Sequence, residues 1–384
     1  MSQSSNNESK QKASPTLPAD QANRRYVVLG AGAIGCYVGG WLAHGGGRVT
    51  LLGRSSLAQA VSSELLLQSV DGQKGRLITQ SASEDGTGSN AQTADASGGV
   101  KSIRISTDPK TLADADVILV AVKSGATGEA AEQILKFAPT GIPVLSLQNG
   151  LSASRTLKKN LPNHPVAAGM VTFNVVREGE PGHGLFRQST SGPLTLEAMQ
   201  EVASIAKQIN DSGVQTDVKA NIERVQWSKL LLNLNNAINA LCGIPVRAML
   251  SDRGYRRIIS ECMKEALSVY KKAGIKPVRL GKIIPSLAPA ILALPDFLFF
   301  RVAATMINID PNAMTSMAQD LMAGKLTEVD FLNGEIVSLA ESVGARAPVN
   351  QGIQSLIHEA EQKNAGSPKL SPSELAKALG LSVH

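Results

Sequence analysis

The chain has 384 residues, 43% of them apolar and 18% charged, which is ordinary for a soluble protein and leaves room for two hydrophobic cores. A net charge of +6 with only 3% aromatic residues favours an anionic small ligand and argues against nucleic acid as a partner. The three cysteines, Cys36, Cys242 and Cys262, lie far apart without metal-ligand spacing, which argues against a disulfide framework or a bound metal and indicates a reducing cytoplasm.

The first folded element is expected only after residue 24. Residues 1–24 are rich in Ser, Gln, Asn and Lys and lack the apolar core of a signal peptide, so they predict a disordered tail. Tyr26–Leu29 has the apolar, β-branched composition of a buried parallel strand. A helix over Ala33–His44 and a second strand over Arg48–Leu52 would complete a βαβ unit.

The turn between this strand and helix reads GAGAIG, in which the glycines have G-x-G-x-x-G spacing. The first glycine permits the tight turn, the second lets the backbone approach a pyrophosphate, and the third lets the helix pack on the strand. The helix N-terminus adds N–H groups and a positive dipole for the phosphates. Strand, turn and helix together argue against a chance glycine turn. They predict a dinucleotide site made by Gly30, Ala31, Gly32, Ala33, Ile34 and Gly35.

The end of the second strand indicates which dinucleotide binds. NAD-binding domains usually place Asp or Glu there, about 20 residues after the glycine turn, to bind the ribose 2′-hydroxyl. This chain has Gly53, Arg54 and two serines instead. The guanidinium of Arg54 can bind a 2′-phosphate with two hydrogen bonds, so the sequence favours NADP or NADPH. The alternative is an ordinary surface arginine.

The rest of the first half continues the sheet. A hairpin is expected around Asp71-Gly72, and residues 81–100 are low in complexity and predict a flexible insertion. Further strands are predicted over Ile103–Ser106, Val117–Val122, Val144–Leu147 and Gly169–Val175. Antiparallel hairpins over 177–197, a helix over 198–210 and a strand near 214–218 would complete an NADP-binding Rossmann-type domain over residues 25–219.

Two polar residues follow buried strands of this domain. Lys123 ends the run VILVAV, and Asn149 comes two residues after the next strand. Ligands of open parallel sheets bind beyond the carboxyl ends of the strands. We therefore expect both side chains at the ligand-binding edge, although either could instead be a helix cap or an ordinary loop residue.

Residues 220–384 are helical in pattern and predict a substrate-binding and catalytic domain. Its first helix, Val225–Gly243, contains one charged residue, Lys229, and is expected to be buried nearly all round. Lys229, Asn233 and Asn236 would lie on one stripe. A buried ammonium is costly unless it is paired, so this stripe should face a cleft and a carboxylate. The alternatives are a polar seam between helices or a lysine that reaches solvent.

Two later stretches offer further polar groups. Ser316 is expected within a helix that starts at Asp310-Pro311, and Glu328 in the first turn of a helix over Thr327–Val343. Ser316 could instead bond to its own helix, and Glu328 could simply complement a helix dipole.

The most apolar stretch of the chain, residues 285–300, is interrupted by Pro289, Pro295 and Asp296 and is too short to cross a membrane. We expect a buried helix and turn there. A lid or a contact between the subunits of a homodimer is the second interpretation, and a membrane-surface anchor is the third.

Taken together, these motifs resemble the ketopantoate reductase family of NADPH-dependent 2-dehydropantoate 2-reductases. The resemblance covers residues 25 to 361. It rests on GAGAIG with Arg54, VKS at Lys123, QNG at Asn149, WSKLLLN around Lys229, and TSMAQD to TEVDFLNG from Thr315. It implies an α/β fold, in which a Rossmann-type dinucleotide-binding domain is followed by an all-helical C-terminal domain.

The resemblance also implies a role for each candidate residue. Lys229 would be the general acid, and Asn233 and Ser316 would bind the substrate. Asn149 would lie between nicotinamide and substrate, and Glu328 would hold the lysine and reach the cofactor. Lys123 would line the nicotinamide side, and Val175 would contact the cofactor through its backbone.

This chain departs from the family in one substrate position. The family often has an asparagine eight residues after the lysine, where this chain has Ala237, so we expect Asn236 to substitute for it. The expected reaction is the reduction of 2-dehydropantoate to pantoate, in the cytoplasm, without a membrane or nucleic-acid partner. The alternatives are another branched 2-oxo acid as substrate, or a catalytically silent NADP-binding regulator.

Overall fold

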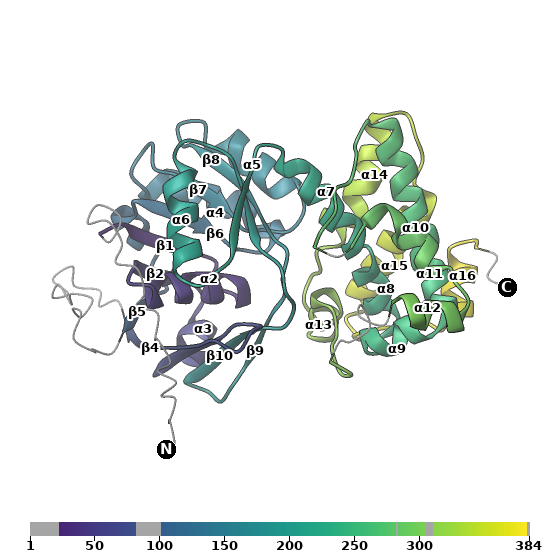
Figure 1. Cartoon of the computed structure of the whole chain (residues 1–384), viewed down its shortest axis with the longest axis horizontal. Helices are drawn as coiled ribbons and strands as arrows, with labels where there is room; N and C mark the ends of the chain where they lie inside the picture. Colours follow the sequence, from purple (N-terminus) through teal and green to yellow (C-terminus); the bar gives the residue numbers. More distant parts are fainter. Residues whose placement is uncertain (1–22, 82–100, 282, 304–309, 382–384) are drawn as a thin grey trace, which may run out of the picture.

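The computed structural model describes residues 23–81, 101–281, 283–303 and 310–381. They form two parts that lie side by side, a sheet with flanking helices and a helical domain, with α7 (Ile222–Asn233) between them (Figure 1). The predicted tail and insertion lie outside the described residues, except Asn23, Arg24 and Ser81, the last of which ends a strand.

Within the described residues, all strands belong to one twelve-stranded sheet, in the order β12-β11-β8-β7-β6-β1-β2-β5-β4-β3-β10-β9. They are β1 (Arg25–Leu29), β2 (Arg48–Leu52), β3 (Glu64–Gln68), β4 (Lys74–Ser81), β5 (Ser102–Ser106), β6 (Val117–Val120), β7 (Val144–Ser146), β8 (Val166–Val171), β9 (Val175–Glu178), β10 (His183–Gln188), β11 (Leu194–Glu197) and β12 (Thr216–Lys219). The six central strands, β5-β2-β1-β6-β7-β8, are parallel throughout. Renumbered along the chain, this order is 3-2-1-4-5-6, the order of a dinucleotide-binding Rossmann sheet.

Helices cover both faces of this sheet, as a parallel sheet requires. They are α2 (Ala33–His44), α3 (Ser55–Ala60), α4 (Thr127–Phe137), α5 (Ser152–Asn160) and α6 (Val202–Asp211). One apolar core contains residues of α2, α6 and the outer strands, and a second contains residues of α4 and α5. Since all six central strands run in one direction, their carboxyl ends share one edge of the sheet.

The helical domain surrounds a third core. It contains α7, α8 (Asn235–Cys242), α9 (Val246–Ser251), α10 (Arg253–Lys272), α11 (Ala288–Leu292), α12 (Asp296–Val302), α13 (Ser316–Met322), α14 (Asn333–Ser342), α15 (Pro348–Lys363) and α16 (Pro372–Ala378). The fold prediction, a Rossmann-type domain followed by a helical domain, is therefore confirmed.

Several predicted boundaries are wrong. The predicted strand 169–175 is two strands, β8 and β9. The predicted helix 225–243 is interrupted at Leu234 into α7 and α8, although none of its residues is exposed. The third predicted helix begins at Ser316 and not at Asp310, because Thr315 caps it: its hydroxyl accepts a bond from the N–H of Ala318.

The apolar stretch 285–300 is helical over α11 and α12, and the prediction that it is buried is confirmed only in part: Ala288, Pro289 and Phe299 are buried, but much of the stretch is exposed. Of the eleven large apolar side chains exposed among the described residues, six lie between 284 and 302. They are Ile284, Leu287, Phe297, Leu298, Phe300 and Val302.

Candidate active site

The glycine turn has the geometry that a dinucleotide requires. Gly30 has φ +89°, and a Cβ there would lie 2.4 Å from the backbone nitrogen of Val122. A Cβ at Gly35 would lie 2.9 Å from the carbonyl oxygen of Gly30, so α2 packs closely on the strand. At Gly32 an added Cβ meets nothing within 4 Å. The middle glycine therefore borders open space, where a pyrophosphate could approach the backbone.

The other residues predicted to bind the dinucleotide lie near this turn or at the same edge of the sheet. Ala33 and Ile34, at the start of α2, and Val175, at the start of β9, pack against the same apolar core. Arg54 follows β2 and precedes α3, with its side chain exposed. Its guanidinium forms no hydrogen bond or ion pair with any residue that the structure describes. Its guanidinium is therefore available to an anionic ligand at this edge of the sheet.

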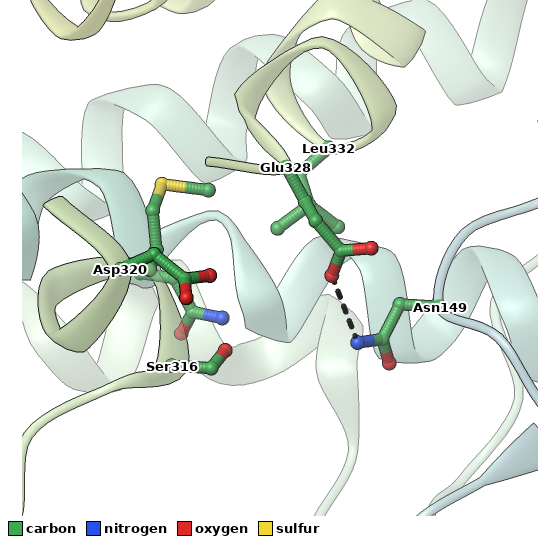
Figure 2. A pocket seen from close by; sticks show the side chains of 7 residues that line it. Asn149, Ser316, Asp320, Glu328 and Leu332 are labelled. Atoms are coloured by element: carbon green, nitrogen blue, oxygen red, sulfur yellow. Dashed lines mark hydrogen bonds between the residues drawn. The ribbon is translucent and has the colours of Figure 1, made fainter. Parts of the chain in front are cut away.

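A small cleft opens between the two domains and is lined by four of the predicted site residues: Asn149, Asn236, Ser316 and Glu328. Asn149 reaches it from the sheet edge, and Ser316 from the first turn of α13. Met317, Asp320 and Leu332 complete the lining. In Figure 2 the Glu328 carboxylate points across the cleft toward the Asn149 amide, while Ser316 and Asp320 approach from α13.

Glu328 links the helical domain to the sheet edge. One carboxylate oxygen accepts hydrogen bonds from the backbone N–H of Ser124, at 2.9 Å, and from its hydroxyl, at 2.7 Å. The other accepts a bond of 3.4 Å from the amide of Asn149. Glu328 directly precedes a short 3₁₀ turn at Val329–Phe331 and is not inside the predicted helix. Its three bonds make it an interdomain clamp.

The ammonium of Lys229 also points toward the sheet edge. It donates a hydrogen bond to the carbonyl oxygen of Val171, the last residue of β8. Burial lowers the pKa of Lys229 to about 8, and the negative charge of Glu328 opposes that shift. The expected ion pair between the two is not formed, because the Glu328 oxygens face Ser124 and Asn149. Lys229 therefore experiences the charge of Glu328 without contacting it.

The amide side chains on this stripe are not equivalent. Asn236 lines the cleft, whereas Lys229 and Asn233 do not. The side chains of Asn233 and Asn236 form no hydrogen bond with a described residue. Asn239 is buried and accepts hydrogen bonds from the N–H and the hydroxyl of Thr315, so it holds α8 against α13. The two uncommitted amides remain free to bind a ligand.

Lys123 crosses the cleft to an acid that the sequence analysis missed. Its ammonium lies 2.6 Å from the carboxylate of Asp320, which lines the cleft. Asp320 follows Ser316 by four residues in α13 and therefore shares its helix face. That spacing was a usable signal in the sequence. Ser124, whose backbone N–H and hydroxyl both bond Glu328, was also missed although it lies in the VKS run, whereas the carbonyl of Val171 has no side-chain signature.

Two family profiles match the chain. The profile described as "Ketopantoate reductase PanE/ApbA" matches residues 26–201, and the one described as "Ketopantoate reductase PanE/ApbA C terminal" matches residues 221–361. The chain belongs to the ketopantoate reductase family. It is therefore an oxidoreductase, and the glycine turn and the family together support a nicotinamide dinucleotide as its cofactor.

Individual relatives agree with this assignment. A 2-dehydropantoate 2-reductase of Halobacterium salinarum is 29% identical over 344 residues, which are 88% of this chain and 99% of that protein. The crystal structure of a PanE/ApbA family ketopantoate reductase from Ralstonia eutropha is also 29% identical. It matches with a TM-score of 0.70 over 88% of this chain and 99% of that chain.

A more distant structure shares the fold alone. It is a ternary structure of D-mandelate dehydrogenase with NADH and anilino(oxo)acetate, 18% identical, with a TM-score of 0.66. It covers 88% of this chain and 99% of that chain. Among the residues that the structure describes, no helix has the length and apolar character that a membrane crossing requires.

Proposed function

We propose that this ketopantoate reductase family member reduces 2-dehydropantoate to pantoate with NADPH. Residues 25–219 would bind the dinucleotide, and residues 220–384 would supply the substrate site and the general acid. One observation carries the proposal: the interdomain cleft gathers Asn149, Asn236, Ser316 and Glu328 at the sheet edge toward which Lys229 points.

The residues fit the proposed cofactor. The open space at Gly32 and the start of α2 suit a pyrophosphate, and the exposed Arg54 suits a 2′-phosphate. Lys123, Asn149, Val175 and Glu328 would border the nicotinamide end. NADPH, when bound, supplies the hydride that reduces the ketone.

The protein must stabilise and protonate the alkoxide that develops on the substrate. Lys229 can do both, because an ammonium attracts the growing negative charge and then donates a proton. One of its three N–H groups is directed at Val171, which orients the ammonium and leaves two N–H groups for the substrate. A pKa of about 8 keeps the ammonium charged at neutral pH, yet able to release its proton.

Neutral donors would bind the rest of the substrate. The amides of Asn233 and Asn236 and the hydroxyl of Ser316 can hydrogen-bond the carboxylate and hydroxyl of a branched 2-oxo acid. Lys123 is already paired with Asp320. Lys229, by contrast, has no carboxylate partner at hydrogen-bonding distance among the described residues. Of the two lysines, it is therefore the better candidate for the cation that receives the reacting oxygen.

A substrate panel tests the proposed reaction. NADPH oxidation should be fastest with 2-dehydropantoate among branched 2-oxo acids of similar size. A tenfold preference for another 2-oxo acid would assign a different substrate to the same site. NADPH binding without turnover on any member of the panel would instead identify a silent NADP-binding regulator.

Arg54 should determine the choice between NADPH and NADH. Arg54→Ala is expected to raise the KM for NADPH about tenfold and leave that for NADH unchanged, because an exposed charge-assisted contact to the 2′-phosphate is lost. Steady-state kinetics with both cofactors measures this. Arg48, exposed at the opposite end of β2, gives the matched control Arg48→Ala, which should change neither value. Equal losses with both cofactors would refute the role of Arg54.

A further inference from the structure

The backbone on each side of Glu328 is fixed by contacts within the helical domain. The carboxylate of Glu361, in α15, accepts a hydrogen bond of 2.7 Å from the backbone N–H of Thr327, the residue directly before Glu328. The hydroxyl of Thr327 in turn accepts a bond of 3.2 Å from the N–H of Val329, the residue directly after it. Val329 is buried in the core of the helical domain. Both neighbours of Glu328 are therefore held, while its own carboxylate extends toward Asn149 (Figure 2).

Two more side chains of α15 hold the next turn of the same segment. The carboxylate of Asp330 accepts a hydrogen bond of 2.6 Å from the amide of Gln354 and lies 2.9 Å from a ring nitrogen of His358. Gln354, His358 and Glu361 are spaced i, i+4 and i+7, so they lie on one face of the helix. These three side chains, the α15 stripe, hold both ends of the short segment that contains Glu328.

The α15 stripe lies outside the cleft. Among the described residues that line the cleft, none belongs to α15. The segment that the stripe holds, in contrast, packs directly on the other domain. The carbonyl oxygen of Phe331 would lie 2.9 Å from a Cβ at Gly150, the residue after Asn149. Any effect of the stripe on the cleft must therefore pass through this segment.

The exact place of Glu328 matters because its charge acts over a distance. Burial lowers the pKa of Lys229 to about 8, and the charge of Glu328 opposes that shift without contacting the ammonium. A Coulomb interaction weakens as the charges move apart. Misplacement of a group in an active site by about 1 Å can cost about 10²-fold in rate. A small shift of the segment would therefore change both the pKa of Lys229 and the rate.

We propose that the α15 stripe, and Glu361 above all, positions Glu328 for the reaction from outside the cleft. This role rests on the proposed function, because it links Glu328 to the general acid Lys229. Glu361 acts through its hydrogen bond to the backbone of Thr327 and not through its own charge. An uncharged acceptor of the same shape should therefore replace it.

Two substitutions at Glu361 test this role. Glu361→Ala should lower kcat for ketone reduction about tenfold, because Glu328 is displaced. The decline of reduction at alkaline pH, expected near the Lys229 pKa of about 8, should move to lower pH, because the displaced charge no longer supports the protonated amine. Glu361→Gln keeps a side-chain oxygen as the acceptor for Thr327 and should retain the wild-type kcat and pH profile. Glu359→Ala, at an exposed carboxylate of the same helix, is the matched control and should change neither.

A double substitution tests whether Glu361 acts through Glu328. Once the Glu328 side chain is removed, its position no longer matters, so Glu361→Ala should cause little further loss in a Glu328→Ala background. Losses that multiply in the double variant would show that the two residues act independently and would overturn the proposal.

A measurement that needs no turnover separates this role from the proposed function. The backbone N–H of Ser124 donates to Glu328, so its hydrogen exchange reports whether the carboxylate is in place. Exchange of a peptide that contains Ser124 should increase in Glu361→Ala and stay at the wild-type level in Glu361→Gln. This pattern in a chain that reduces no 2-oxo acid would refute the proposed function and still support the positioning of Glu328.

Other results would overturn the positioning role. Equal losses in Glu361→Ala and Glu361→Gln would assign the effect to the charge of Glu361. A lower rate with an unmoved pH profile and unchanged exchange at Ser124 would show a merely structural role. If Glu361→Ala does not fold, the variant Gln354→Ala/His358→Ala releases Asp330 from a half-exposed surface and should shift the pH profile in the same direction. An unmoved profile in that folded variant would also exclude the role.

Discussion

Lys229→Ala should reduce turnover of 2-dehydropantoate by about 10²–10⁴-fold, the contribution of a positioned general acid. The variant lacks the ammonium that stabilises and protonates the developing alkoxide. NADPH binding, measured by fluorescence titration, should be retained, because the glycine turn and Arg54 lie on other elements. The matched control is Lys272→Ala, at an exposed lysine of α10, which should keep full activity.

The pH dependence of the wild-type enzyme tests the same assignment. Burial lowers the pKa of Lys229 to about 8 from the ordinary value of 10.5, so the protonated fraction falls as pH rises above 8. The kcat/KM for ketone reduction should therefore decline above pH 8, whereas oxidation of pantoate, which needs the neutral amine, should rise through the same range. Lys229→Ala should lack this limb. Full activity in the variant, or a reduction profile that stays flat to pH 10, would remove Lys229 from the mechanism.

The nucleotide-binding half could be predicted from local sequence because short-range patterns determine it. The helix Ala33–His44 and the strand Arg48–Leu52 have the predicted boundaries, since a glycine turn and a glycine stop delimit the helix. The parallel strands are buried on both faces, so continuous apolar runs identify them. The break between β8 and β9 was missed because residues 169–173 keep the composition of a strand while the pairing partner changes from β11 to β10.

The candidate site was predictable only in part. Asn149, Asn236, Ser316 and Glu328 do meet in one cleft, although they come from both domains. The sequence could not predict which hydrogen-bond partner each polar side chain has. Lys229 was expected to contact Glu328, yet it bonds the backbone of Val171, and Glu328 bonds Ser124 and Asn149. Periodicity places a side chain on a face of its helix, but the packing between domains selects the atom that it meets.

Interruption of the first C-terminal helix shows the same limit. Lys229, Asn233 and Asn236 form one stripe on an ideal helix, yet α7 ends at Asn233 and only Asn236 of the three lines the cleft. The apolar composition of α12 likewise indicated burial, yet Phe297, Leu298, Phe300 and Val302 are exposed, because composition does not tell which face of a helix packs on the core. Both errors arise from tertiary packing that local sequence does not encode.

Glu328→Ala should lower kcat/KM by about 10²-fold, since it removes two charge-assisted hydrogen bonds to Ser124 and one to Asn149 that hold the domains together across the cleft. The Glu328→Gln variant distinguishes the effect of the negative charge of Glu328 from the effect of its hydrogen bonds. It keeps a carbonyl acceptor for the Ser124 donors but removes the negative charge that raises the pKa of Lys229. The alkaline limb of reduction should then move below pH 8. A merely structural role for Glu328 would lower the rate without moving the limb.

The matched control for Glu328 is a second carboxylate that links the domains without entering the cleft. Glu223 of α7 lies 3.5 Å from Arg155 of α5, with 60% of its side chain exposed. An exposed ion pair of this kind contributes about 0–1 kcal/mol, so Glu223→Gln should change kcat/KM by less than about fivefold and leave the pH limb in place. If Glu223→Gln and Glu328→Gln shift the limb equally, the effect comes from loosened domains, and the electrostatic coupling between Glu328 and Lys229 is refuted.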